Sequence, residues 1–445
     1  MAERLQFDVS LGRRGRAREE SDPMRLLVLG NFSGDANVDR PPLASRPTQR
    51  VDIDNLDDVM RRMSPRLTTT SGEIRFQGID EFHPDSLYGR LDLFKALRQA
   101  RANPPADGGD LGRLLGKPAE RSASPAPASA GGLDALIRDI VAPHIVRDSS
   151  AQEKSYQAGV DAAIAEQMRS LLHDQAFQSL EAAWRGLQWL VTGLELDENL
   201  QLHVLNVTRE ELLADILAAN GALAHTGLYR AVVDRWRNVP GSHGWSALVA
   251  TIDFGPSNDD VGLLAALGVI ASQAGGPILA GANGALSSDA DQGSSAAWNA
   301  LRHSEVAPWI GLSAPRVLMR LPYGKGSDPI DAFAFEEFVG PPVHEEFLWG
   351  HASFATALLL GRAFTARGWE MEPGDEREIG DLPAFTFVRD GEREMQACAE
   401  RYLTEREIER LLSAGLIPLV SRRDRNAVVA MRIQSVSDPL APLAW

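Results

Sequence analysis

GWSALVATIDFG at 244–255, followed by DVGLLAALGVIASQAGGPILAG at 260–281, decides the fold class of this chain. The first stretch is an almost continuous apolar run that ends at a glycine, which is typical of a strand buried on both faces. The second predicts a helix, a glycine stop and another short apolar strand. Strand, helix and strand in this order indicate parallel pairing. The sequence therefore predicts an α/β (mixed α+β) fold, in which mixed sheets are flanked by helices.

The same alternation continues on both sides of this stretch. Toward the C-terminus, an apolar helix is predicted within 347–368, and 404–435 reads as helix, glycine cap, strand, charged turn and strand. Toward the N-terminus, 156–191 predicts one long helix, and 200–208 predicts a strand. Thr208 followed by Glu211 predicts a capping box at the start of the next helix.

A tract of different composition interrupts the pattern at 104–132, which reads PPADGGDLGRLLGKPAERSASPAPASAGG. It is rich in Pro, Ala, Gly and Ser and poor in large apolar residues, so it predicts a disordered linker that spans about 30 Å as a coil. Apolar patterning returns on both sides of it. The predicted division is an N-terminal strand and charged arm (1–22), a small domain (23–103), the linker (104–132) and a large domain (133–445).

The small domain carries its own set of elements. MRLLVLGNFSG at 24–34 predicts a buried strand, 55–63 a helix, 73–79 a strand, and 82–101 a turn followed by an amphipathic helix. The glycines of GNFSG lack the spacing of a dinucleotide fingerprint or a P-loop. No cofactor is predicted.

Apolar residues that alternate with polar ones mark a candidate interaction strand near the N-terminus. They are Leu5, Phe7, Val9 and Leu11. The polar arm after them offers no sheet partner, so this strand either pairs with its own domain or adds to the edge of a neighbour.

A second candidate interaction segment is a short apolar helix directly after the linker. Its apolar residues at helical spacing include Leu133, Leu136, Ile137 and Ile140. A helix beside a disordered tract either docks in the groove of a partner or packs on its own domain.

The totals exclude several classes of protein. The formal charge of −16 over 445 residues argues against a surface that binds nucleic acid over the whole molecule. No apolar run is long enough to insert into a membrane, and the start, MAERLQFDVS, lacks the apolar region of a secretion signal. Cys398 is the only cysteine, which excludes an internal disulfide. A cytoplasmic protein is the simplest interpretation.

Residues of the types used in catalysis do not form a known signature. HEEFLWGH at 344–351 has Leu348 where a zinc protease needs its second histidine, so no metal site is predicted. Cys398 lies in a segment that predicts a helix and has no histidine nearby in sequence. The pairs Glu336–Glu337 and Glu345–Glu346 leave open an enzyme that uses two carboxylates. This is the weakest of the functional alternatives considered below.

Several pieces of the sequence resemble the two subunits of the contractile sheath of bacterial type VI secretion systems. The N-terminal half resembles the small subunit, TssB, and the second half resembles the large subunit, TssC. The small-subunit pieces are RLLVLGNFSG (25–34), RPPL with VDIDNLDDVMRRMSPRL (40–67) and EIRFQGIDEFHPDSL (73–87). The large-subunit pieces include HDQAFQSLEAAWRGLQWLV (173–191), LHVLNVTREEL (202–212), WSALVATIDFG (245–255), WIGLSAPRVLMRLPYG (309–324), FLWGHASFA (347–355) and TEREIERLLSAGLIPL (404–419).

The resemblance implies a structural role without catalysis. In that family the two subunits pair into a protomer, and protomers form a helical sheath around an inner tube above a baseplate. An AAA+ unfoldase recycles the sheath by gripping a short helix of the large subunit, which the segment with Leu133, Leu136, Ile137 and Ile140 matches by position. The expected partners are therefore other copies of the chain, the inner tube protein, the baseplate and the unfoldase. Fusion of the two halves would fix their stoichiometry through effective concentration.

The chain also departs from the family pattern, because it ends at DPLAPLAW where large subunits usually continue. This leads us to expect that the usual C-terminal extension is lacking. It leaves open an alternative, a non-contractile adaptor or cap that works as a monomer or small ring.

Overall fold

The structure is a computed structural model of the chain. It describes residues 19–35, 40–69, 72–103, 140, 152–237, 242–287 and 296–445. Residues 19–103 are called the N-terminal part here, and residues 152–445 the C-terminal part.

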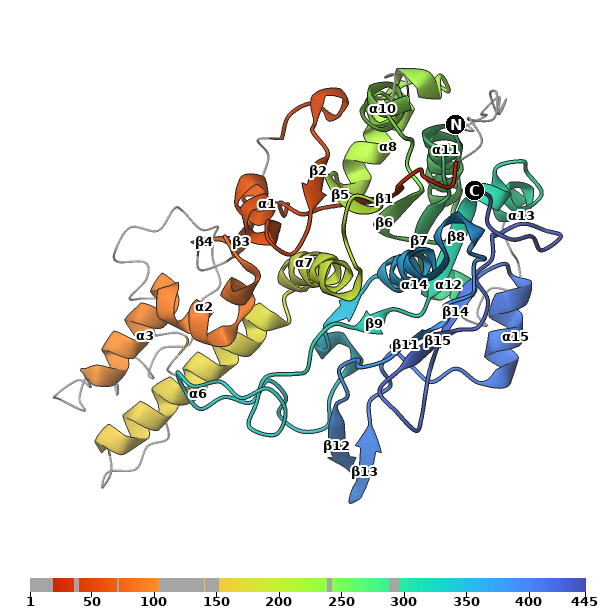
Figure 1. The fold of residues 1–445 in the computed structure, drawn as a ribbon. Helices are drawn as coiled ribbons and strands as arrows, with labels where there is room; N and C mark the ends of the chain where they lie inside the picture. The colour runs from red at the N-terminus through yellow and green to blue at the C-terminus, as the bar shows by residue number, and fades with distance from the viewer. Residues whose placement is uncertain are drawn as a thin grey trace.

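One sheet of nine strands forms the centre of the molecule (Figure 1). In sheet order the strands are β11 (Glu378–Ile379), β15 (Val428–Ala430), β14 (Ile417–Ser421), β8 (Ile310–Ala314), β7 (Ile278–Ala282), β6 (Ala247–Phe254), β1 (Met24–Gly30), β5 (Leu200–Asn206) and β2 (Gln49–Val51). The six strands from β14 to β5 pair in parallel, and β2, β15 and β11 pair antiparallel at the two edges. The sheet is therefore mixed, as the sequence predicts.

Helices cover both faces of this sheet and create two apolar cores. The first core packs against α7 (Gln175–Gly193) and α14 (Ala352–Arg367), and the second against α8 (Arg209–Ala218) and α11 (Asn258–Ala274). Strands such as β1 are apolar on both sides because each side faces one of these cores.

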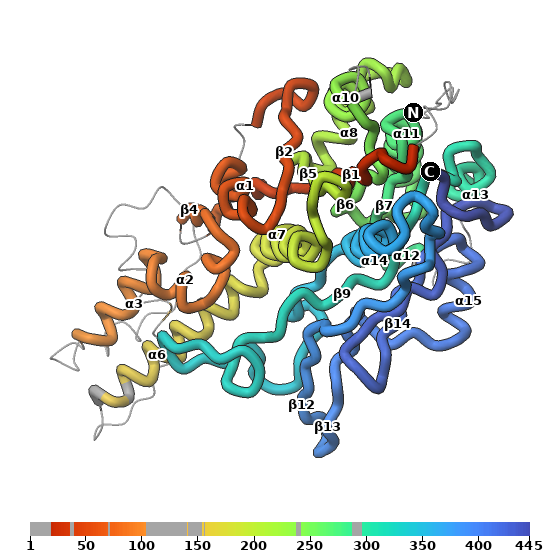
Figure 2. The backbone as a smooth tube through the Cα atoms, in the orientation of Figure 1, coloured from red at the N-terminus to blue at the C-terminus, as the bar shows by residue number. Residues whose placement is uncertain are grey.

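The remaining elements of the N-terminal part lie at one end of the sheet. They are α1 (Leu56–Met63), the hairpin of β3 (Arg66–Thr69) and β4 (Gly72–Arg75), α2 (Pro84–Arg90) and α3 (Asp92–Ala102). Helix α3 packs along α6 (Gln152–Leu172) of the C-terminal part, where Arg101 Nε lies 2.5 Å from Asp161 Oδ1. These two helices project together from the body of the molecule (Figure 2).

The C-terminal part also contains shorter elements around the sheet. Two small sheets pair β9 (Val317–Leu318) with β10 (Trp349–Gly350) and β12 (Thr386–Arg389) with β13 (Glu392–Met395). The short helices include α9 (Gly227–Tyr229), η5 (Arg230–Asp234), α10 (Arg235–Arg237), α12 (Gly284–Ser287), α13 (Ala296–Arg302) and α15 (Glu405–Ser413). Three more are single turns, η4 (Leu223–His225), η6 (Ala307–Trp309) and η8 (Gly368–Glu370). Residues 319–348 contain no strand and only one short helical turn, η7 (His344–Glu346). In the described parts of the chain, no helix has both the length and the apolar character needed to cross a bilayer.

Three predictions of secondary structure were wrong. The segment 82–101 holds two helices, α2 and α3, instead of a turn and one helix. The helix predicted at 156–191 is two helices, α6 and α7, because the side chain of Asp174 caps a new helix by accepting from Phe177 N at 3.0 Å. Cys398 does not lie in a helix: it follows β13 in an irregular segment, where its side chain is fully buried. Polar helix-forming residues such as Glu392 and Glu394 instead form an exposed hairpin around the turn at Gly391.

Candidate interface between the N-terminal and C-terminal parts

The first contact between the two parts is the insertion of β1 into the central sheet. Strand β1 pairs in parallel with β5 on one side, from Met24↔Leu200 to Gly30↔Asn206, and with β6 on the other side. A strand from the N-terminal part therefore lies between two strands of the C-terminal part. The backbone hydrogen bonds on both edges of β1 are contacts between the two parts.

Aromatic side chains extend this contact on one face of the sheet. The rings of Phe32 and Trp184 meet edge to face at 5.2 Å, and Trp184 Nε1 donates to Phe32 O at 2.9 Å. Further along α7, Phe177 packs against Phe76 and Phe82 at 6.0 and 5.6 Å. All five rings are fully buried, so the first core is built by both parts together.

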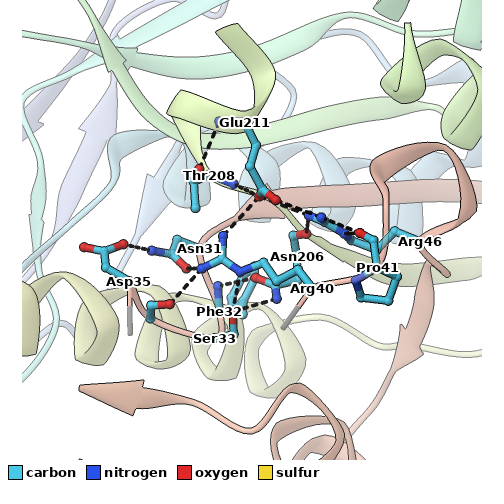
Figure 3. Close-up of polar contacts among 11 residues, drawn as sticks. Asn31, Phe32, Ser33, Asp35, Arg40, Pro41, Arg46, Asn206, Thr208 and Glu211 are labelled. Atoms are coloured by element: carbon cyan, nitrogen blue, oxygen red, sulfur yellow. Dashed lines mark hydrogen bonds and ion pairs between the residues drawn. The ribbon is translucent and has the colours of Figure 1, made fainter. Parts of the chain in front are cut away.

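A cluster of polar contacts lies where β1 and β5 end, and Figure 3 shows how its side chains converge. The carboxylate of Glu211 in α8 forms ion pairs with Arg40 Nη1 at 3.0 Å and with Arg46 Nη2 at 2.8 Å. Both arginines belong to the N-terminal part. Arg46 Nη1 also donates to Asn206 O at 2.5 Å, and Asn206 Nδ2 donates to Ser33 Oγ at 2.9 Å. These five residues are called the polar clamp.

The same glutamate closes the capping box that the sequence predicts. Glu211 N donates to Thr208 Oγ1 at 3.1 Å, and Thr208 N donates to Glu211 Oε2 at 3.0 Å. Burial alone would raise the pKa of Glu211, but hydrogen bonds from Arg46 and Thr208 and the charges of Arg46 and Arg40 lower it to about 2. The carboxylate is therefore charged at neutral pH and anchors two arginines.

Residues 319–348, called the strap, bind the N-terminal part at a second place. Asp85, in the first turn of α2, accepts from Asp331 N at 3.1 Å and from Ala332 N at 2.9 Å. Next to it, Tyr88 and Phe333 stack with their ring centroids 4.5 Å apart. The strap thus binds α2 at a place away from the central sheet, and its course runs beside α6 (Figure 1).

A buried ionic network fixes the base of the strap. Arg320 Nη1 lies 2.8 Å from Glu337 Oε2, and Arg320 Nε lies 3.0 Å from Glu181 Oε1 of α7. Burial opposes ionisation of Glu337, but the charge of Arg320 and hydrogen bonds from His173, Arg320 and Tyr323 N lower the pKa of that carboxyl to about 2. Because all three charged side chains are buried, each depends on its partners.

The structure describes one of the eight residues proposed from sequence as interaction residues. Leu5, Phe7, Val9, Leu11, Leu133, Leu136 and Ile137 lie outside the described residues. Ile140 is helical and half-buried, and it packs against the first core.

The residues considered for catalysis have structural partners. Glu337 belongs to the buried network, whereas Glu336 is exposed and accepts from Lys325 N at 3.2 Å. His344 lies in η7 and His351 precedes α14, so the two do not lie on one helix. In the ranges given above, no group of three or more His, Cys, Asp and Glu side chains is placed to hold a metal ion.

A cleft of about 310 Å³ lies beside the polar clamp, at the carboxyl ends of β1 and β6. His351 Nδ1 and Asp253 Oδ1 face each other there at 3.2 Å. Burial opposes ionisation of Asp253, but His351 holds the pKa of that carboxyl below its usual range. The other lining groups, such as Asn31 and Arg209, are already bound to carboxylates, and they define no particular ligand.

Comparison with known proteins assigns the two parts. Residues 154–437 match the family model described as EvpB/VC_A0108, tail sheath N-terminal domain (VipB), and residues 1–104 match the model described as type VI secretion system, VipA, VC_A0107 or Hcp2. The chain belongs to the type VI secretion tail sheath family. It joins a small-subunit region (VipA, or TssB) and a large-subunit region (VipB, or TssC), as the sequence resemblance indicates.

One curated relative agrees with this assignment. The type VI secretion system sheath protein TssC1 of Pseudomonas aeruginosa (strain PAO1) is 30% identical over 317 residues, which cover 66% of this chain and 63% of TssC1. The chain thus spans less than two thirds of the length of that relative. A solved structure of the anti-feeding prophage baseplate covers 58% of this chain and 51% of its own, with 17% identity and a TM-score of 0.30.

Proposed function

We propose that this chain is a one-chain protomer of a type VI secretion sheath. Copies of it would assemble in the cytoplasm into a helical polymer around an inner tube, without catalysing a reaction. The baseplate and an AAA+ unfoldase would be its further partners, the latter through the segment with Leu133, Leu136, Ile137 and Ile140.

The observation that carries this proposal is the position of β1 between β5 and β6. A subunit of a polymer must be folded as one body before it assembles, because each copy presents its surfaces to several neighbours. With β1 in the sheet and the strap over α2, the small-subunit region is held on two sides. The covalent join would then supply the two regions at equal number in every protomer.

Electron microscopy of the purified chain tests self-assembly. We expect negatively stained tubes, together with light scattering that rises with concentration. Particles that remain monomers or small rings at high concentration would contradict the sheath and favour a sheath-derived adaptor or cap.

A matched pair of variants tests the proposed role of the N-terminal strand in that assembly. The triple variant Leu5→Asp, Phe7→Asp and Val9→Asp changes the apolar face and should abolish the tubes. The control variant Gln6→Glu and Ser10→Asp changes the opposite face of the same strand and should leave them intact. Tubes of unchanged length in the triple variant would rule out strand addition between copies.

A further inference from the structure

Arg25 is a buried cation near the amino end of β1, and its side chain is held by aromatic rings. Its guanidinium carbon lies 4.4 Å from the ring centroid of Trp236 and 4.3 Å from that of Trp245. Nη1 donates to His243 O at 2.5 Å, and the residue is only 5% exposed. Within the described ranges, no carboxylate forms an ion pair with it. Two indole faces and one carbonyl therefore stabilise this charge.

Burial disfavours the charged forms of Arg25 and of the neighbouring His203. Burial lowers the pKa of Arg25 to about 10, which still leaves it protonated at neutral pH. Burial, with the charges of Arg25 and Arg50, lowers the pKa of the neighbouring His203 to about 3. That ring is therefore neutral, and it packs against Trp245 at 5.1 Å as a further wall of the cage.

The other residues of β1 do not fix the register of the strand against β5 and β6. Met24, Leu26 and Val28 face the first core, and Leu27 and Leu29 face the second. A slide by two residues keeps this alternation and exchanges one aliphatic side chain for another.

Two residues distinguish the observed register from a slide toward the carboxyl edge. Such a slide would move Arg25 to the place of Leu27, where an unpaired charge would be buried among apolar groups. It would also move Val28 to the place of Gly30. A Cβ atom at Gly30 would already lie 2.4 Å from Thr251 Oγ1, so that side chain acts as a steric stop.

We propose that Arg25 is the positioning residue that fixes the register of β1 between β5 and β6, with Trp236 and Trp245 as its cage. The space between β5 and β6 therefore selects a strand with a cation near its amino end, apolar residues along its length and a glycine at its carboxyl end. This inference concerns the pairing of the two regions within one chain, and it does not depend on polymer formation.

Disulfide trapping in the full chain reports the register directly. The background carries Cys398→Ser, which removes the only cysteine, and Thr251→Ala, which removes the steric stop. Val28→Cys with Val249→Cys probes the observed register, because these two residues are partners in the sheet. Leu26→Cys with Val249→Cys probes the slide by two, because those positions are about 8 Å apart before the slide and too far for a disulfide.

We expect only the Val28–Val249 product while Arg25 is present. Arg25→Met keeps the length of the side chain without the charge, and it should raise the Leu26–Val249 product about ten-fold or more, which corresponds to about 1.4 kcal/mol. Arg25→Lys should restore the single register, and Arg50→Met, a change to an exposed arginine of β2, should not alter it.

An Arg25→Met protein that forms the Val28–Val249 product alone would overturn the proposal. If Arg25→Met does not fold, Trp236→Leu opens one wall of the cage and provides the same test. A Trp236→Leu protein confined to the observed register would then overturn it.

Discussion

Glu211 links three segments of the chain through one carboxylate. It closes the capping box of α8 and binds Arg40 and Arg46 of the small-subunit region. Thr208 and Glu211 can be predicted as a capping pair from their spacing alone. The two arginines could not be predicted as partners, because they lie 171 and 165 residues away in sequence. Their occurrence near RPPL, a piece shared with the small subunit, was the one available signal.

Glu211→Gln should lower the free energy of unfolding by about 2 kcal/mol, because it leaves the buried Arg46 and the partly buried Arg40 without their anion. Denaturant unfolding monitored by tryptophan fluorescence measures this loss. Glu210→Gln is the matched control, since Glu210 is the exposed neighbour in the same turn, and it should change stability by less than about 0.5 kcal/mol. Equal effects of the two changes would show that the polar clamp does not stabilise the contact.

The same carboxylate predicts a dependence of stability on pH. Its pKa is about 2 in the folded chain and near 4.5 when unperturbed, so its contribution is complete above pH 4.5 and is lost as the pH falls toward 2. Because the side chain is 31% exposed, we expect the ionised carboxylate to contribute about 2 kcal/mol to the free energy of unfolding after solvent screening. The difference in unfolding free energy between wild type and Glu211→Gln should therefore shrink from pH 5 to pH 2. A difference that stays constant over this range would contradict the assignment.

Glu337→Gln should be more damaging than any change to its exposed neighbour. It removes one partner of a buried ion pair with Arg320, and such a loss costs about 3–5 kcal/mol. Glu336→Gln is the matched control, and it should change the free energy of unfolding by about 1 kcal/mol or less. Thermal unfolding of the two variants measures the contrast, and similar melting temperatures would refute it.

At the scale of elements, local sequence pattern predicted the regular strands and helices well. The buried runs at β1, β6 and β7 and the amphipathic pattern of α15 lie where the sequence places them. The break between α6 and α7 was missed, because apolar residues continue on both sides of Asp174 and hide the cap. The strap was not predicted, because the contacts that hold it to the rest of the molecule, such as those with Asp85 and Glu181, are distant in sequence.

Asp85→Ala tests whether the strap is held by α2. Loss of the carboxylate removes the acceptor for the amides of Asp331 and Ala332, so hydrogen exchange in the segment around 331–332 should accelerate about ten-fold or more, equivalent to about 1.4 kcal/mol. Asp92→Ala, at the start of the neighbouring helix α3, should leave that segment unchanged. Unaltered exchange in Asp85→Ala would mean that other contacts, such as Tyr88 on Phe333, hold the strap alone.

At the scale of the whole molecule, the tract at 104–132 was predicted to divide the sequence, whereas residues from both sides of it build the first core. Composition predicts this division of the sequence. It cannot show that β1 pairs with β5 and β6, because those strands begin at Leu200 and Ala247, far along the chain. Strand order is a property of long-range packing, and the apolar pattern of β1 fits many partners.

Native-state hydrogen exchange of the full chain tests the central claim, that the two regions form one cooperative body. We predict that the amides of β1 exchange only through global unfolding, with the same free energy as those of β6. Unfolding followed by tryptophan fluorescence should give that same value, because all nine tryptophans lie in the large-subunit region. If β1 and α1 exchange at a free energy several kcal/mol below that of β6, the small-subunit region opens on its own and the account of a single protomer body is wrong.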